Sequence, residues 1–225
     1  MVKRAEVKSR GFARIPDGLG AHIDCYELLG LFSAGDELVG NARFEGLELN
    51  HDSANGATFD TVVFRGCEFD HADFRNSTFR DVRFEGCRLV GCSMDKAWLN
   101  RVDFIDCSAP GLSLMQTRLA GVSIRDTDLS YANLSEASID RLRIHGTRLR
   151  EAALQRAKLK NVTLEGSDLT RIDVFGTPLK GIDLSACQFQ VPVLSADHHE
   201  LRGAIVSPEQ AIDLVQLLGV QIADE

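Results

Sequence analysis

The sequence predicts an all-β solenoid, a four-sided β-helix of about 7.5 coils that ends in a short C-terminal α-helix. Two periods predict this fold. Every fifth residue from Phe44 to Phe189 is apolar, at thirty positions without a slip in the count. A five-residue period matches neither the 3.6-residue turn of an α-helix nor the two-residue alternation of a flat strand. The chain must therefore turn once in every five residues.

The second observation is the residue two places before each of these apolar positions. It is small or apolar almost throughout, and Asp52 is the only charged residue among the thirty. Two side chains of every five therefore point inward, one large and one small, which fits a narrow tube. Every twentieth residue forms a column of like residues: Val62, Val82, Val102 and Val122; Phe44, Phe64, Phe84 and Phe104; Cys67, Cys87 and Cys107; Gly46, Gly66, Gly86, Gly146 and Gly166. A coil of twenty residues with one turn in every five residues has four walls. The glycine column fits a corner between two walls, because glycine readily adopts a positive φ.

Three segments, Ala72-Asp73-Phe74, Ala132-Asn133-Leu134 and Ser167-Asp168-Leu169, resemble the A-(D/N)-L-x-x pattern of the pentapeptide-repeat family. The resemblance covers residues 41–190 of the 225-residue chain. It implies a right-handed quadrilateral β-helix, stabilised by the burial of each coil against its neighbours.

The period divides the chain into an N-terminal capping segment (1–40), a β-helix (41–194) and a C-terminal connection with its helix (195–225). The first forty residues lack the five-residue period. Because a β-helix exposes strand edges at its ends, apolar side chains of this segment are expected to cover the first coil. These are Ile23, Tyr26, Leu28, Leu29, Leu31, Phe32 and Leu38.

A short helix is predicted near the C-terminus. Ser207 is the expected N-cap, Pro208 the first helical residue and Gln210 the partner in a capping box. Its apolar stripe must pack against the last coil, against a second chain, or against both: Ile212, Leu214, Val215, Leu217 and Leu218. Family members are often homodimers through their C-terminal ends, so the resemblance implies a homodimer.

No enzyme activity, cofactor, metal site or catalytic residue is expected, because a filled tube has no pocket and no nucleophile motif, zinc spacing or phosphate loop is present. Five of the six cysteines, Cys67, Cys87, Cys92, Cys107 and Cys187, occupy the small inward position and are interpreted as apolar fillers rather than a redox or metal cluster. His51 and His71 should stack on one corner as surface side chains. Without a signal peptide or a long apolar stretch, a cytoplasmic protein without a membrane span is expected.

Binding is the function that remains. The best-known branch of the resembled family, the Qnr class and the related mycobacterial fluoroquinolone-resistance protein, mimics B-form DNA and engages type II topoisomerases, protecting gyrase from quinolones. This resemblance gives a candidate acidic contact patch in the first coils: Glu48, Asp52, Glu68, Asp70 and Asp73. The basic residues of the second half oppose mimicry along the whole rod: Arg141, Arg143, Arg148, Arg150, Lys158, Lys160 and Lys180.

The alternative is a general protein-interaction scaffold with an unknown partner. Four apolar residues at outward positions are its candidate contacts: Trp98, Ile105, Met115 and Phe175. Arg118 stands one coil from Trp98, so a cation–π contact is the structural explanation of that tryptophan. A pI near 5.3 and the lack of aromatic interleaving argue against direct nucleic-acid binding. One continuous acidic face would favour DNA mimicry, and mixed charge would favour the scaffold.

Overall fold

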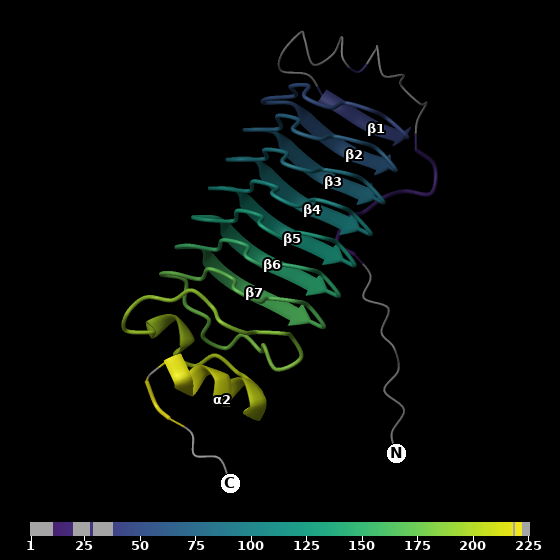
Figure 1. Ribbon diagram of the computed structural model, residues 1–225. Coiled ribbons are helices and arrows are strands. Elements are labelled where there is room, and N and C mark those ends of the chain that lie inside the picture. The colour runs from purple at the N-terminus through teal and green to yellow at the C-terminus, as the bar shows by residue number, and fades with distance from the viewer. Residues whose placement is uncertain (1–10, 20–27, 29–37, 218, 222–225) are drawn as a thin grey trace, which may run out of the picture.

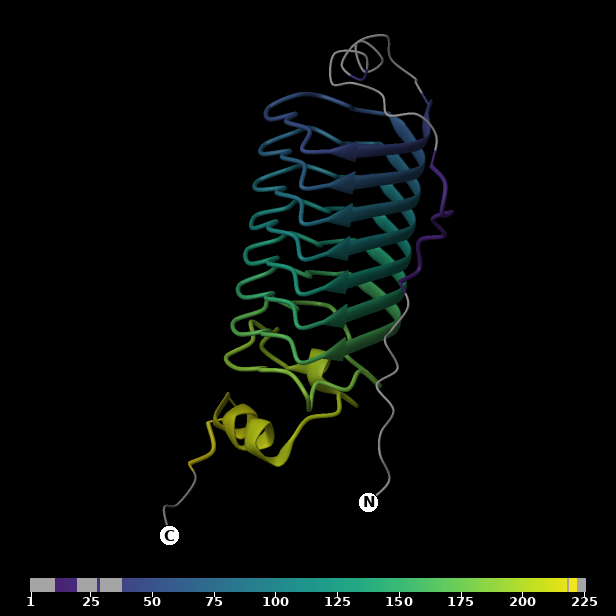
Figure 2. The same cartoon turned by 90° about the vertical axis from the view of Figure 1, so that its right-hand side faces the viewer.

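A computed structural model describes residues 11–19, 28, 38–217 and 219–221. Seven parallel strands stack in sequence order along the rod (Figures 1 and 2). They are β1 (Leu38–Glu45), β2 (Thr58–Arg65), β3 (Thr78–Glu85), β4 (Trp98–Ile105), β5 (Arg118–Arg125), β6 (Ser138–His145) and β7 (Lys158–Glu165). Each strand pairs with the next at an offset of twenty residues, so Val62 lies beside Val82 and Phe64 beside Phe84. The predicted β-solenoid and its twenty-residue coil are confirmed.

One residue in every five turns the chain. From Asn41 to Gly181, every fifth residue has a positive φ, which places four corners in each coil. The predicted glycine column, which starts at Gly46, lies at one of these corners. The other walls are held by backbone hydrogen bonds between coils, such as that from Leu49 N to Glu68 O at 2.8 Å. The four-sided cross-section therefore follows from a left-handed residue at each corner.

The regular strands end earlier than thirty repeats imply. Six steps of twenty residues separate β1 from β7, where about 7.5 coils were predicted. The residue that opens each strand donates its backbone N–H to the coil before it, as Lys158 does to Ala137 O at 2.9 Å. The next residue in this column is Pro178, which has no N–H to donate. The inward apolar pattern still continues to Phe189, but it forms no further eight-residue strand within the described residues.

Phenylalanine fills the interior of the first coils. Phe44, Phe64, Phe84 and Phe104 form a stacked column, with ring centroids 5.3, 5.2 and 4.9 Å apart. Phe69, from the adjoining wall, meets Phe64 edge-on at 5.2 Å. Stacked and edge-on rings are the favoured aromatic geometries. The stacked rings therefore stabilise the packing of one coil on the next, and the edge-on rings stabilise the packing between adjoining walls of the tube.

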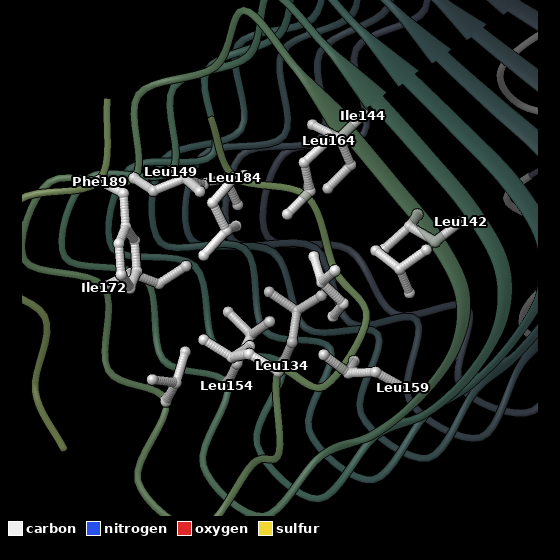
Figure 3. Close-up of a pocket in the computed structure, with 15 residues that line it drawn as sticks. Leu134, Leu142, Ile144, Leu149, Leu154, Leu159, Leu164, Ile172, Leu184 and Phe189 are labelled. Carbon is white, nitrogen blue, oxygen red and sulfur yellow. The ribbon is translucent and has the colours of Figure 1, made fainter. Parts of the chain in front are cut away.

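Leucine and isoleucine replace phenylalanine toward the C-terminal end, where the packing is looser. An apolar cavity of about 30 Å³ lies there within the tube (Figure 3). Leu134, Leu154 and Leu159 are among the side chains that line it. The two halves of the rod therefore share one backbone plan but differ in how completely their interiors are filled.

The five cysteines predicted as fillers are buried and form no disulfide: Cys67, Cys87, Cys92, Cys107 and Cys187. Burial raises the pKa of the Cys92 thiol to about 12, so this thiol is protonated at neutral pH. A neutral, protonated sulfur packs as a small apolar group. Cys67, Cys87, Cys107 and Cys187 are spaced by multiples of twenty residues because each coil has twenty residues.

The C-terminal end of the rod is closed first by η1 (His199–Leu201). The carboxylate of Glu200 is fully buried and accepts hydrogen bonds from Gly176 N at 2.8 Å and from Ser195 N at 3.2 Å. In the preceding coil the equivalent donor, Arg156 N, bonds to the carbonyl oxygen of Phe175. Glu200 thus replaces a backbone acceptor that a further coil would have supplied.

The helix α2 (Pro208–Leu217) closes the same end, and it begins with the predicted capping box. Gln210 N donates to Ser207 Oγ at 3.2 Å, and Ser207 N donates to Gln210 Oε1 at 2.7 Å. The amide nitrogen Nε2 of Gln210 also donates to the carbonyl oxygens of Leu184 and Cys187, at 3.0 and 2.7 Å. One side chain therefore caps the helix and satisfies carbonyls of the last coil.

The N-terminal segment differs in part from expectation. Leu28 is buried, but Leu38 is 66% exposed, because it opens β1 at an outward position. The expected capping residues Ile23, Tyr26, Leu29, Leu31 and Phe32 lie outside the described residues. Residues 11–19 do not cover the first coil. They run along the side of the strand wall (purple in Figures 1 and 2).

Candidate functional site

The candidate acidic patch lies on adjoining walls of the first coils, with arginines among its carboxylates. Glu48 and Glu68 are exposed and pair in register from neighbouring coils. Asp70 is held by Arg88 Nε at 2.6 Å. The fourth carboxylate, Asp73, forms an ion pair with Arg75 NH2 at 2.7 Å, and this guanidinium lowers the pKa of Asp73. The fifth, at position 52, is half-exposed.

Ion pairs between coils continue along the rod. Arg65 lies between Glu45 and Glu85, at 3.6 and 2.8 Å. Further pairs join residues twenty apart: Arg80–Asp60, Arg101–Asp81, Arg148–Asp128, Arg156–Glu136 and Arg171–Glu151. Because acidic and basic side chains alternate from coil to coil, the described surface carries mixed charge. Most of these pairs are exposed, so each contributes little to stability.

The four outward apolar residues are not equally accessible. Trp98 is 40% exposed and Phe175 is 44% exposed, whereas Ile105 and Met115 are half-buried. Trp98 pairs in register with Arg118, as the column predicted, but the predicted cation–π contact between these two described residues is not formed. The four do not belong to one wall of one coil, so they form no single patch.

Besides Phe175, six large apolar side chains among the described residues that follow β7 in the sequence are exposed. They are Val191, Val193, Ile205, Ile212, Leu217 and Val220. Within α2, Ile212 and Leu217 are exposed, Leu214 packs against the interior cluster and Val215 is half-buried. Leu218 lies outside the described residues. The helix therefore covers the last coil with one face and presents apolar groups on another.

One polar cluster near the C-terminus has the residue types of a hydrolase triad. Ser195 Oγ lies 2.9 Å from Nδ1 of His199, and Asp197 Oδ1 lies 2.7 Å from the same nitrogen. A catalytic triad needs the acid and the nucleophile on different ring nitrogens. The hydrogen bond to Asp197 raises the pKa of His199. This arrangement organises the turn before Glu200 and does not activate a nucleophile.

The predicted histidine pair is present at its corner, since the rings of His51 and His71 stack with centroids 5.2 Å apart. Among the described residues, no group of three or more His, Cys, Asp or Glu side chains could hold a metal ion. No described helix is long and apolar enough to cross a membrane.

Sequence reasoning missed one site, where residues 11–16, here called the strap, dock on the strand wall. Phe12 N and Ala13 N donate to the two carboxylate oxygens of Asp103, at 2.7 and 3.3 Å. Arg14 N donates to Asp81 Oδ1 at 2.9 Å. Asp103 is only 1% exposed, although its position in the repeat points outward.

Close packing completes the docking of the strap. The guanidinium carbon of Arg143 lies 4.3 Å from the centroid of the Phe12 ring. A Cβ added at Gly121 would approach that ring to 3.4 Å, and a Cβ added at Gly11 would come within 2.1 Å of Asp103 Oδ2. The contact thus requires glycine at position 11, whereas a Cβ at position 121 would only touch the ring. The sequence did contain a sign of this covered surface. In the outward column that holds Asp103, the charged residues are interrupted by Val63 and Ser123, and both are buried.

Two family models match the chain. The model described as "Pentapeptide repeat region" matches residues 57–134 and 77–154, and the model described as "Pentapeptide repeats (8 copies)" matches residues 147–185. Together they span more than half of the chain, so it belongs to the pentapeptide-repeat proteins. No curated protein matches the sequence.

Solved structures share this fold at low identity. HetL, a pentapeptide repeat protein involved in heterocyst differentiation regulation in the cyanobacterium Nostoc sp. strain PCC 7120, is 21% identical, with a TM-score of 0.53; the match covers 83% of this chain and 94% of HetL. Full-length QnrB1, a plasmid-mediated fluoroquinolone resistance protein, is 19% identical, with a TM-score of 0.42; the match covers 80% of this chain and all of QnrB1. At 21% identity, the likeness to HetL shows a shared fold and nothing about function.

Proposed function

We propose that the chain is a non-enzymatic protein-interaction scaffold that works as a homodimer. The dimer is supported by the exposed apolar side chains at the C-terminal end, which include Ile212 on α2 and Ile205, the partner of Asp183 in the last coil. Apolar groups that a monomer leaves in water are the usual core of a subunit interface. A two-fold contact through this end would leave the walls of both rods available to partners. Five free buried thiols support a reducing, cytoplasmic location.

Ile212→Glu should convert the dimer to a monomer, because a charge would be buried at the centre of the apolar contact. Light scattering should give about twice the 24.7 kDa mass of one chain for the wild type and one chain mass for the variant. Leu38→Glu, at an apolar residue that is also exposed but lies at the other end of the rod, is the matched control and should leave the mass unchanged. A monomeric wild type at micromolar concentration would refute the dimer.

The candidate partner of this scaffold is a type II topoisomerase. The family resemblance suggests it, and the exposed residues Glu48 and Glu68, which pair in register from neighbouring coils, support it as a small acidic contact in the first coils. Arg88 and Arg75 neutralise the neighbouring Asp70 and Asp73, so the charge supports contact by this end and not mimicry of DNA along the whole rod.

A gyrase supercoiling assay with and without ciprofloxacin tests this partner. We expect micromolar wild-type protein to inhibit supercoiling or to restore it in the presence of the drug. The double variant Glu48→Lys/Glu68→Lys should need at least about 10-fold more protein, because charge reversal removes the electrostatic attraction. Glu165→Lys, an exposed change in β7, should behave as wild type. No inhibition and no protection by wild-type protein would remove the topoisomerase and leave the general scaffold.

A further inference from the structure

The strap contacts the rod as a bound peptide would, and not as part of its core. Its docking uses backbone N–H groups of Phe12, Ala13 and Arg14, which any extended segment offers. None of residues 11–19 belongs to the interior apolar cluster. The coils therefore build their own interior, and the strap lies on a wall that is complete without it.

The acceptors under the strap are built into the rod. Arg101 holds Asp81 through two hydrogen bonds, at 2.7 and 2.6 Å. Arg83 Nε lies 3.6 Å from Asp103 Oδ2. The carboxylates are thus fixed in position by neighbouring coils before a peptide arrives. Fixed, buried acceptors favour backbone recognition, because no side chain has to be ordered on binding.

The strap fills this site incompletely. A groove of about 690 Å³ remains beside it, lined on the rod side by Arg83, Arg101 and Arg141. Arg14 of the strap also lines the groove, where its charge favours the Asp81 carboxylate, but it leaves the site with the strap. Each of the three guanidinium groups of the rod carries five N–H donors, whereas the carboxylates around them also accept from other groups: Asp81 and Asp103 from the strap amides, and Glu85 from Arg65. The rod side of the groove therefore keeps N–H donors that an incoming carboxylate would satisfy.

We propose that the strap is an internal pseudoligand and that its groove binds an extended segment of a partner protein in which an acidic residue follows an aromatic one. The aromatic side chain takes the place of Phe12 between Arg143 and Gly121. The acidic side chain takes the place of Arg14 and accepts hydrogen bonds from the arginines of the groove. This surface is on the strand wall, apart from the dimer end and the acidic patch.

Release of the strap in the full-length chain is the first step of the test. Phe12→Pro removes both the aromatic ring and the N–H that donates to Asp103. Gly11→Val releases it independently, because the new side chain would collide with the Asp103 carboxylate. Both variants should melt as cooperatively as the wild type, and trypsin should cleave after Arg14 at least about 10-fold faster than in the wild type, since opening controls cleavage.

Peptide binding is the second step. The probe is a fluorescent peptide of residues 9–17 that carries Arg14→Glu, followed by polarisation. It should bind the Phe12→Pro protein at least about 10-fold more tightly than wild type, whose tethered strap competes at high effective concentration. Asp103→Asn in the same background should weaken binding at least about 10-fold, whereas Glu165→Gln, at an exposed residue of β7 that does not line the groove, should leave it unchanged.

A released, folded variant that binds no peptide would show that the strap is only a structural cover. If the Asp103→Asn substitution did not change the affinity for the peptide, the peptide would bind at another place on the rod. A native-sequence peptide that binds as tightly as the Arg14→Glu peptide would refute the acidic partner. A peptide with Phe12→Ala that binds equally well would refute the aromatic requirement.

Discussion

Phe84→Ala should lower the free energy of unfolding by about 3–5 kcal/mol. The Phe84 ring is fully buried and stacks between Phe64 and Phe104, at centroid distances of 5.2 and 4.9 Å. Hydrogen-bonded coils on both sides keep their spacing, so the walls cannot collapse into the space left by the ring. Urea denaturation followed by circular dichroism measures the change.

Glu48→Ala is the control for this prediction. Glu48 is an exposed outward residue of the first coils, and its replacement should change the free energy of unfolding by less than about 0.5 kcal/mol. Similar losses at positions 84 and 48 would contradict the assignment of inward and outward side chains.

Glu200→Ala should cost about 2–4 kcal/mol, because it leaves the N–H groups of Gly176 and Ser195 without their acceptor at a closed end of the rod. The same contact makes this end sensitive to acid. Burial of Glu200 opposes its charge, but the hydrogen bonds it accepts outweigh burial and lower its pKa. Its contribution is therefore complete well above the ordinary pKa of 4.5 and is lost as the pH falls below that value.

Glu200→Gln separates the acid effect from the loss of the side chain. It keeps one acceptor oxygen and does not titrate, so its free energy of unfolding should fall less than that of the wild type between pH 7 and pH 4. Asp213→Asn, an exposed change on α2, should retain the wild-type pH dependence. Equal acid sensitivity in the wild type and the Glu200→Gln variant would show that Glu200 does not close the end in its charged form.

The repeat made most of the interior predictable. A column such as Val62, Val82, Val102 and Val122 can be read directly from the sequence, because the coil places like residues in register. The coil count was overestimated because apolar periodicity reports burial and not which walls form regular strands. Pro178 keeps the count of five but cannot continue the strand wall, although other walls stay paired beyond β7, as Asp173 with Val193.

The surface was less predictable, because it depends on which side chains meet. The arginines that follow the patch in the sequence could be seen, but not which carboxylate each would meet: Arg88, eighteen residues on from Asp70, comes to lie beside it in the next coil. The strap lay beyond sequence reasoning for a different reason. Phe12 and Asp103 are 91 residues apart, and their contact uses a backbone N–H that every residue but proline has.

The strap also constrains the number of coils in the rod, because it contacts several strands at once. Loss of any twenty consecutive residues, such as 98–117, would rejoin the walls in register and shorten the rod by one turn. Loss of a number that is not a multiple of five would move inward residues to outward positions. Arg14 reaches Asp81 in β3 while Phe12 lies under Arg143 in β6. If the number of turns between β3 and β6 changed, the strap could not make the Asp81 and Arg143 contacts at the same time. The contacts of the strap therefore require a fixed number of coils between these two strands.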